Sequence, residues 1–143
     1  MNKNKNLQNS EVNVRGINFR LMTYTNSLEL CSRMNYETEN LDFIDMIKPD
    51  EIMYDLGACE GRFSIYAAKK GVRVVSFEPE KKNFFVLSQN LELNNLNNNN
   101  YQIYKKNINS IAAKLMSKNL IIARCVGRAE FGARSLGNRS ILS

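Results

Sequence analysis

The sequence predicts an α/β fold built on a partial doubly wound parallel sheet, in the strand order 3-2-1-4, with a small N-terminal hairpin or edge strand. Two apolar runs, Ile52–Leu56 and Val72–Phe77, flank a stretch with helical spacing, as in a strand–helix–strand unit. A turn with glycine at Gly57 and Gly61 follows the first run. Because such crossovers are right-handed, the third strand lies beyond the second, and the ligand crevice opens at the carboxyl end of the first.

The N-terminal part is predicted to hold a disordered start, a hairpin and a helix. Residues 1–10 are rich in Asn and Lys and lack periodicity, which is typical of a disordered terminus. Alternating apolar residues then surround Arg15-Gly16, as in a hairpin or a bent edge strand. Glu37 to Ile47 has helical spacing, and Lys48-Pro49-Asp50 ends that helix. The alternating residues are Val12, Val14, Ile17, Phe19 and Leu21.

The segment after the glycine turn is predicted to alternate between helix and strand. The next helix after Val72–Phe77 starts near Pro79, and the polar run Asn94–Asn100 is an exposed loop. Tyr101–Lys105 is then the third strand. The expected apolar side of the first helix is Phe63, Ile65, Tyr66 and Ala67, and the expected inner stripe of the second is Phe84, Leu87, Ser88 and Leu91.

The last part of the chain is predicted to add one helix and one strand. Ser110–Lys118 has helical spacing, and Leu120–Val126 is an apolar run of strand length. We expect Leu120–Val126 to pair in parallel beside Ile52–Leu56, because a bare first strand would leave an apolar edge open. Arg128–Ser143 is expected to emerge near the ligand crevice as a loosely held tail.

The chemistry of the glycine turn favours a nucleoside ligand with a cationic group. Glu78 closes the second strand, where a carboxylate can accept both hydroxyls of a ribose. Gly57 allows a sharp turn, and Gly61 removes a side chain where a ligand approaches the helix. An acid at Asp55 would repel a pyrophosphate but can hold an ammonium group. S-adenosyl-L-methionine carries such a group.

The two segments YDLGACEGRFSIYAAKKG and VVSFEPEKKNFFVLSQNLELNN resemble the FkbM-type S-adenosylmethionine-dependent methyltransferases. The resemblance covers about residues 12–107 and implies a truncated, Rossmann-like O-methyltransferase domain of low or no activity. It implies a sugar or secondary-metabolite hydroxyl as acceptor. The cofactor-binding residues that follow from it are Asp55, Gly57, Ala58 and Gly61 at the methionine end and Glu78 on the ribose.

From Ile108 onward the sequence resembles the C-terminal domain of nodulation-type O-carbamoyltransferases. Ala133 and Ser135 stand where that family usually has proline and alanine. The resemblance implies a site for phosphate, carbamoyl phosphate or ATP on Arg128, Glu130, Arg134, Arg139 and Ser140. The matching positions are Gly127, Arg128, Glu130, Gly132, Arg134, Leu136, Gly137, Arg139, Ser140 and Ile141.

These resemblances predict three parts, residues 1–10, 11–107 and 108–143, and leave three functions open. The first is a truncated methyltransferase, the second a carbamoyltransferase fragment, and the third a non-catalytic hybrid remnant. No catalytic residue can be named, because the chain has no histidine to serve as the commonest general base.

Composition narrows the class of partners. The formal net charge is +6, and 6 of the 20 basic residues but only 1 of the 14 acidic residues lie from Ile108 to Ser143. Arginines among glycines there favour a small anion over a nucleic acid. Three cysteines, Cys31, Cys59 and Cys125, indicate neither a disulfide framework nor a metal site. With no apolar run of membrane length, a cytoplasmic protein with a small-molecule substrate is expected.

Overall fold

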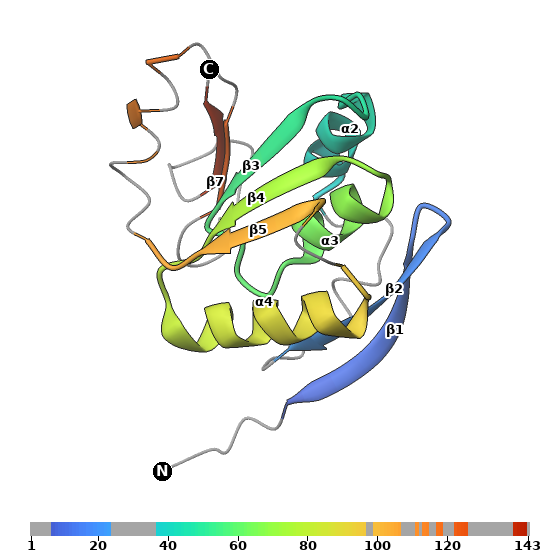
Figure 1. Ribbon diagram of the computed structural model, residues 1–143. Coiled ribbons are helices and arrows are strands. Elements are labelled where there is room, and N and C mark those ends of the chain that lie inside the picture. Colours follow the sequence, from blue (N-terminus) through green and yellow to red (C-terminus); the bar gives the residue numbers. More distant parts are fainter. Residues whose placement is uncertain are drawn as a thin grey trace.

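The centre of the protein is a five-stranded sheet in the order β5-β4-β3-β6-β7, seen in the computed structural model in Figure 1. The structure describes residues 7–23, 37–96, 99–106, 111, 113, 114, 117, 118, 122–125 and 139–142. The strands of this sheet are β3 (Ile52–Leu56), β4 (Arg73–Phe77), β5 (Tyr101–Tyr104), β6 (Ile122–Cys125) and β7 (Arg139–Leu142).

The first four of these strands pair as the sequence predicts. β3 and β4 are parallel, as are β4 and β5. β6 is parallel to β3, with Asp55 opposite Ala123 and Leu56 opposite Arg124, which gives the predicted order 3-2-1-4.

The prediction of a loosely held tail over Arg128–Ser143 is wrong for its last part. Arg139–Leu142 forms β7, which pairs antiparallel with β6. An added strand satisfies the backbone groups along the outer edge of β6, which would otherwise lie unpaired. Residues 126–138 lie outside the described residues. Of the predicted helix over Ser110–Lys118, Ile111, Ala113 and Lys114 are helical and Ser117 and Lys118 form a turn, and the other four residues lie outside the described residues.

Three helices confirm the predicted helical segments: α2 (Thr38–Met46), α3 (Arg62–Lys69) and α4 (Lys81–Leu93). Because β3, β4 and β5 follow one another in the sheet through right-handed crossovers, α3 and α4 cover the same face. The strand residues that point to this face, Met53, Val74 and Tyr101, are buried in one cluster with α3 and α4.

The buried side of α4 differs from the predicted stripe. Leu87 and Leu91 are buried as predicted, but Phe84 is only partly buried, and the Ser88 hydroxyl bonds to the Phe85 carbonyl oxygen. Asn90 is fully buried instead. An amide was not expected on this side because a buried polar group needs partners that the helix itself does not supply.

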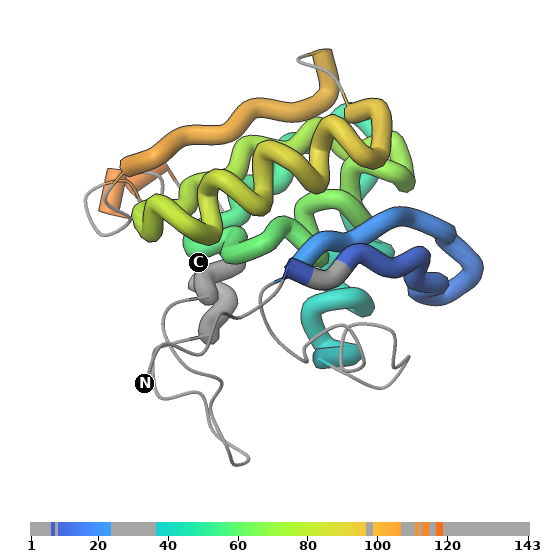
Figure 2. Tube along the Cα trace, turned by 90° about the horizontal axis from the view of Figure 1, so that it is seen from below, coloured from blue at the N-terminus to red at the C-terminus, as the bar shows by residue number. Residues whose placement is uncertain are grey.

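β1 (Gln8–Val14) and β2 (Ile17–Thr23) form the predicted antiparallel hairpin, and β2 packs on α3 and α4. Its turn is Arg15-Gly16, where both residues have positive φ. β1 begins at Gln8, so the predicted disordered segment over residues 1–10 is too long, and residues 1–6 lie outside the described residues. In Figure 2 the hairpin lies between α4 and α2. Its buried apolar residues are Val12, Val14, Phe19 and Leu21.

Two buried amides, Asn90 of α4 and Asn94 at its C-cap, bind the free edge of β2. Asn94 Oδ1 accepts from the Arg20 N–H at 2.9 Å, and Asn94 Nδ2 donates to the Arg20 carbonyl oxygen at 2.7 Å. Asn90 makes the same pair with Met22, at 2.6 Å and 2.9 Å. The helix thus takes the place of a third strand beside the hairpin.

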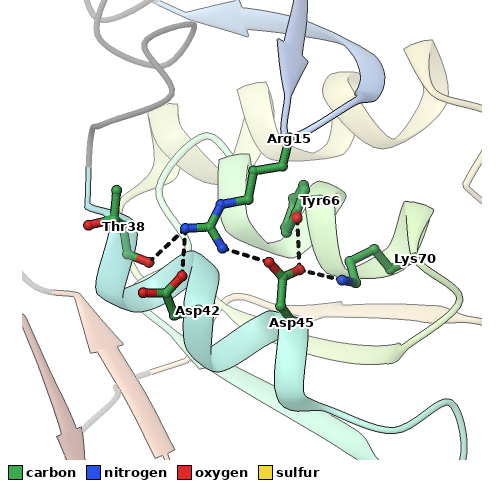
Figure 3. A network of polar contacts seen from close by, with 6 residues as sticks. All are labelled: Arg15, Thr38, Asp42, Asp45, Tyr66 and Lys70. Atoms are coloured by element: carbon green, nitrogen blue, oxygen red, sulfur yellow. Dashed lines mark hydrogen bonds and ion pairs between the residues drawn. The ribbon is translucent and has the colours of Figure 1, made fainter.

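The turn of the hairpin, at the opposite end from Met22, is held by an ionic network, drawn in Figure 3. The Arg15 guanidinium lies 2.6 Å from a carboxylate oxygen of Asp42 and 2.6 Å from one of Asp45, both on α2. Tyr66 and Lys70 donate to the other oxygen of Asp45. Burial raises the pKa of Asp45, but the hydrogen bonds from Lys70, Arg15 and Tyr66 outweigh it and hold that pKa below its usual value.

Asn90→Ala should lower the free energy of unfolding by about 3 kcal/mol, because it removes the side-chain partner of three partly buried backbone groups, two of Met22 and one of Glu60. Urea denaturation measures this loss. Glu92→Ala, at an exposed position of the same helix, is the control and should change stability by less than about 0.5 kcal/mol. Equal stabilities for the two variants would contradict the role given to the Asn90 amide.

Candidate functional site

The predicted ligand turn joins β3 to α3 and lies against the carboxyl end of β4. The N–H groups of Gly57 and Ala58 both donate to the Phe77 carbonyl oxygen, at 2.7 Å and 3.2 Å. Gly57 has φ of 89°, a conformation that L-residues rarely adopt. The turn is therefore placed where a crevice at the carboxyl ends of the first two strands is expected.

Glu78 follows β4 directly and is 3% exposed. One carboxylate oxygen accepts from the Cys59 N–H of the turn at 2.8 Å, and the other accepts from the Glu80 N–H at 2.8 Å. Burial raises the pKa of the Glu78 carboxyl, and these two donors partly offset that rise. The carboxylate thus stands at the junction of the turn and the second strand, and its role as a ribose acceptor stays a prediction.

Asp55 is buried against α3, and its carboxylate accepts a hydrogen bond from the Ser64 hydroxyl. Ser64 Oγ lies 2.7 Å from Ser76 Oγ, which lies 2.7 Å from the Tyr101 hydroxyl. A series of hydrogen bonds thus connects side chains of β3, β4 and β5. Burial raises the pKa of Asp55 to about 6, the Ser64 bond opposes this, and the charge of Glu78 adds to it. The contact to an ammonium group predicted for Asp55 is untested, and its observed partner is Ser64.

The hydrogen-bonded series from Asp55 through Ser64 and Ser76 to Tyr101 was not predicted. The signal was a polar residue at an inward position of an otherwise apolar strand, Ser76 between Val75 and Phe77. A buried hydroxyl at such a position requires a hydrogen-bonding neighbour.

Gly61 is explained by packing between the turn and α4. A Cβ added at Gly61 would lie 2.3 Å from Leu87 Cδ1, and φ is +89°. By contrast, a Cβ added at Gly71, with φ of +91°, would meet nothing within 4 Å. A ligand was expected beside Gly61, but Leu87 fills the space that a side chain at this position would occupy. Its assignment as a cofactor-binding residue is otherwise untested.

The remaining candidate residues are placed as follows. Ala58 is buried in the turn, and Cys59 is half-buried with φ of 51°. Arg139 and Ser140 lie in β7, opposite Cys125 and Arg124 of β6. The other residues of the predicted anion site, Arg128, Glu130 and Arg134, lie outside the described residues. Among the residues that are described, no three potential metal ligands gather into a site.

The arrangement of sheet, glycine turn and acidic residue defines an S-adenosylmethionine-dependent methyltransferase-like fold. Residues 23–126 match the family model of the tellurite resistance protein TehB, and the chain belongs to this family. Residues 113–143 match the model of the carbamoyltransferase C-terminus. No curated protein sequence matches the chain significantly.

Solved structures support the same fold. A Streptococcus mutans protein assigned as an S-adenosylmethionine-dependent methyltransferase has 16% identity, a TM-score of 0.56, and coverage of 78% of this chain and 30% of that one. Methanocaldococcus jannaschii Trm5, in complex with adenosine, has 16% identity, a TM-score of 0.55, and coverage of 82% and 42%. The Thermus thermophilus 16S rRNA N2 G1207 methyltransferase, in complex with AdoMet and guanosine, has 18% identity, a TM-score of 0.53, and coverage of 73% and 29%.

This chain spans less than half the length of each of these proteins. At these identities the likeness shows the fold alone. The family model that matches is that of TehB, so the FkbM type remains a finer prediction. In the described part of the chain, none of the helices has the length and apolar character of a membrane span.

The stability of the protein should fall as pH rises from about 4 to about 6, because folded Asp55 holds its proton in this range and unfolded Asp55 does not. A rise of about two pH units in its pKa corresponds to about 3 kcal/mol. Asp55→Asn should remove this part of the slope. Urea denaturation of both proteins at pH 4, 5, 6 and 7 measures it. Parallel pH profiles for the two proteins would contradict the buried, titrating state of Asp55.

Proposed function

We propose that the chain binds S-adenosyl-L-methionine at the glycine turn, as a partial methyltransferase domain. The observation that best supports this is the place of Glu78, a buried carboxylate at the carboxyl end of β4, whose oxygen lies 2.8 Å from the Cys59 nitrogen of the turn. In doubly wound sheets, ligands bind outside the carboxyl ends of the strands, and an acid after the second strand accepts ribose hydroxyls.

The residues present fit this ligand. Each oxygen of Glu78 has one N–H donor at 2.8 Å, and a carboxylate oxygen can accept two hydrogen bonds. The Asn83 side chain also hydrogen-bonds to this carboxylate. Glu78 therefore keeps acceptor capacity for a ribose hydroxyl. Several solved structures of this fold hold AdoMet, S-adenosylhomocysteine or adenosine, which supports a nucleoside ligand for the fold generally.

The chain's own residues would bind and orient the cofactor, which when bound supplies a methyl group on a sulfonium. Glu78 accepts the ribose hydroxyls, and the Gly57-Ala58 backbone faces the methionine end. Asp55 holds the start of α3 through its hydrogen bond with Ser64. We propose that its negative charge also attracts the ammonium group of the cofactor. Transfer from such a site depends mainly on in-line placement of the acceptor.

The finer form of the proposal is FkbM-type O-methylation of a sugar or secondary-metabolite hydroxyl, with low or no turnover in this chain. Basic and acidic residues nearly balance before Ile108, which favours a small-molecule acceptor over a nucleic acid or a membrane.

A second candidate, a carbamoyltransferase fragment that binds carbamoyl phosphate or ATP, is favoured by the match of residues 113–143 to the carbamoyltransferase C-terminus. Titration with carbamoyl phosphate tests it, and Arg139→Ala should remove any binding. If neither this ligand nor S-adenosylhomocysteine binds, the chain is a non-catalytic hybrid remnant.

Glu78→Ala should abolish measurable binding of S-adenosylhomocysteine, because the ribose hydroxyls lose their acceptor. Glu78→Gln should weaken it about tenfold or more, because a charge-assisted hydrogen bond is replaced by a neutral one. Isothermal titration calorimetry at pH 7 measures both. Glu92→Gln, which removes an exposed carboxylate from α4, should bind like the wild type. The same affinity in Glu78→Ala and wild type would refute the assignment of Glu78.

A further inference from the structure

We infer that the N-terminal hairpin sets the conformation of the glycine turn, with Thr23 and Asn90 as positioning residues for the cofactor site. The inference rests on the proposed function for its ligand, but its geometry stands alone. Thr23, the last residue of β2, is fully buried, and its hydroxyl donates to a carboxylate oxygen of Glu60 at 2.5 Å. Glu60 belongs to the turn between β3 and α3.

The same residue of the turn is held a second time, from α4. Asn90 Nδ2 donates to the Glu60 carbonyl oxygen at 2.7 Å, in addition to its bond to the Met22 carbonyl oxygen. Both hydrogens of that amide group are therefore used, one on the hairpin and one on the turn. Asn90 thus joins three elements at one point.

These contacts lead directly to the candidate ribose acceptor. Glu60 follows Cys59, whose N–H donates to Glu78 at 2.8 Å and whose φ of 51° is unusual for a residue with a side chain. A connected path thus runs from Thr23 through Glu60 and Cys59 to Glu78. A strained residue keeps its conformation only where its surroundings fix it, and here the fixing groups come from β2, α4 and the end of β4.

The bond between Thr23 and Glu60 is separate from the contacts that dock the hairpin. Docking uses the Arg20 and Met22 backbone, whereas the Thr23 hydroxyl donates to Glu60 of the turn. A loop that is already in its binding conformation pays less ordering cost when a ligand binds. Loss of the Thr23 hydroxyl should therefore loosen the turn while the hairpin stays docked.

Hydrogen exchange of the ligand-free chain tests the geometry. In Thr23→Val, a near-isosteric change, the N–H groups of Cys59 and Gly61 should exchange about tenfold faster than in wild type, because a bond to a charged group is lost. Thr23→Ser keeps the hydroxyl and should exchange like wild type. Phe19→Leu, a core change in the same hairpin, is the control for general destabilisation.

Titration of the same variants with S-adenosylhomocysteine tests the link to the site. The dissociation constant should rise about tenfold in Thr23→Val, and it should stay near the wild-type value in Thr23→Ser and Phe19→Leu. Unchanged exchange of the turn in Thr23→Val, or equal acceleration in Phe19→Leu, overturns the inference. Wild type that fails to bind the ligand refutes the proposed function, and the exchange data still decide the role of Thr23.

Discussion

The pairing of two amides, one in α4 and one at its C-cap, with the edge of β2 is the interaction on which the rest of the structure depends. It works because the spacings agree: residues four apart in a helix lie about 6 Å apart along its axis, and residues two apart in a strand lie about 7 Å apart. Asn90 and Asn94 can therefore each bind one of Arg20 and Met22. This fixes the register of the hairpin on α4 and covers the core above α3.

The same helix organises the candidate site. Leu87 packs where Gly61 lacks a side chain, and Asn90 binds the Glu60 carbonyl oxygen, so one face of α4 contacts both the hairpin and the glycine turn. At the far end of the hairpin, Arg15 of the turn binds Asp42 and Asp45 of α2 (Figure 3). The hairpin is thus anchored at both ends, and its inner end lies at the turn that leads to Glu78.

The spacing of apolar residues predicted the helices and strands well, but it could not predict the polar contacts between them. The apolar runs of β3 and β4 and the helical spacing of α3 are local patterns, and the pairing of β6 beside β3 followed from the need to cover an apolar edge. The buried position of Asn90 was not predicted, because an amide side chain on an amphipathic helix is expected to face solvent unless a hydrogen-bonding partner is known. β7 was missed for a similar reason, since pairing of Arg139–Leu142 with β6 depends on contacts distant in sequence.

The central claim is that the turn and Glu78 together hold a nucleoside. Adding S-adenosylhomocysteine to the uniformly nitrogen-15-labelled chain and recording its amide NMR spectrum tests this most directly. The account predicts that the largest shifts fall on the N–H groups of Cys59 and Glu80, which bind the Glu78 carboxylate. No shift, or shifts confined to β7, would contradict it.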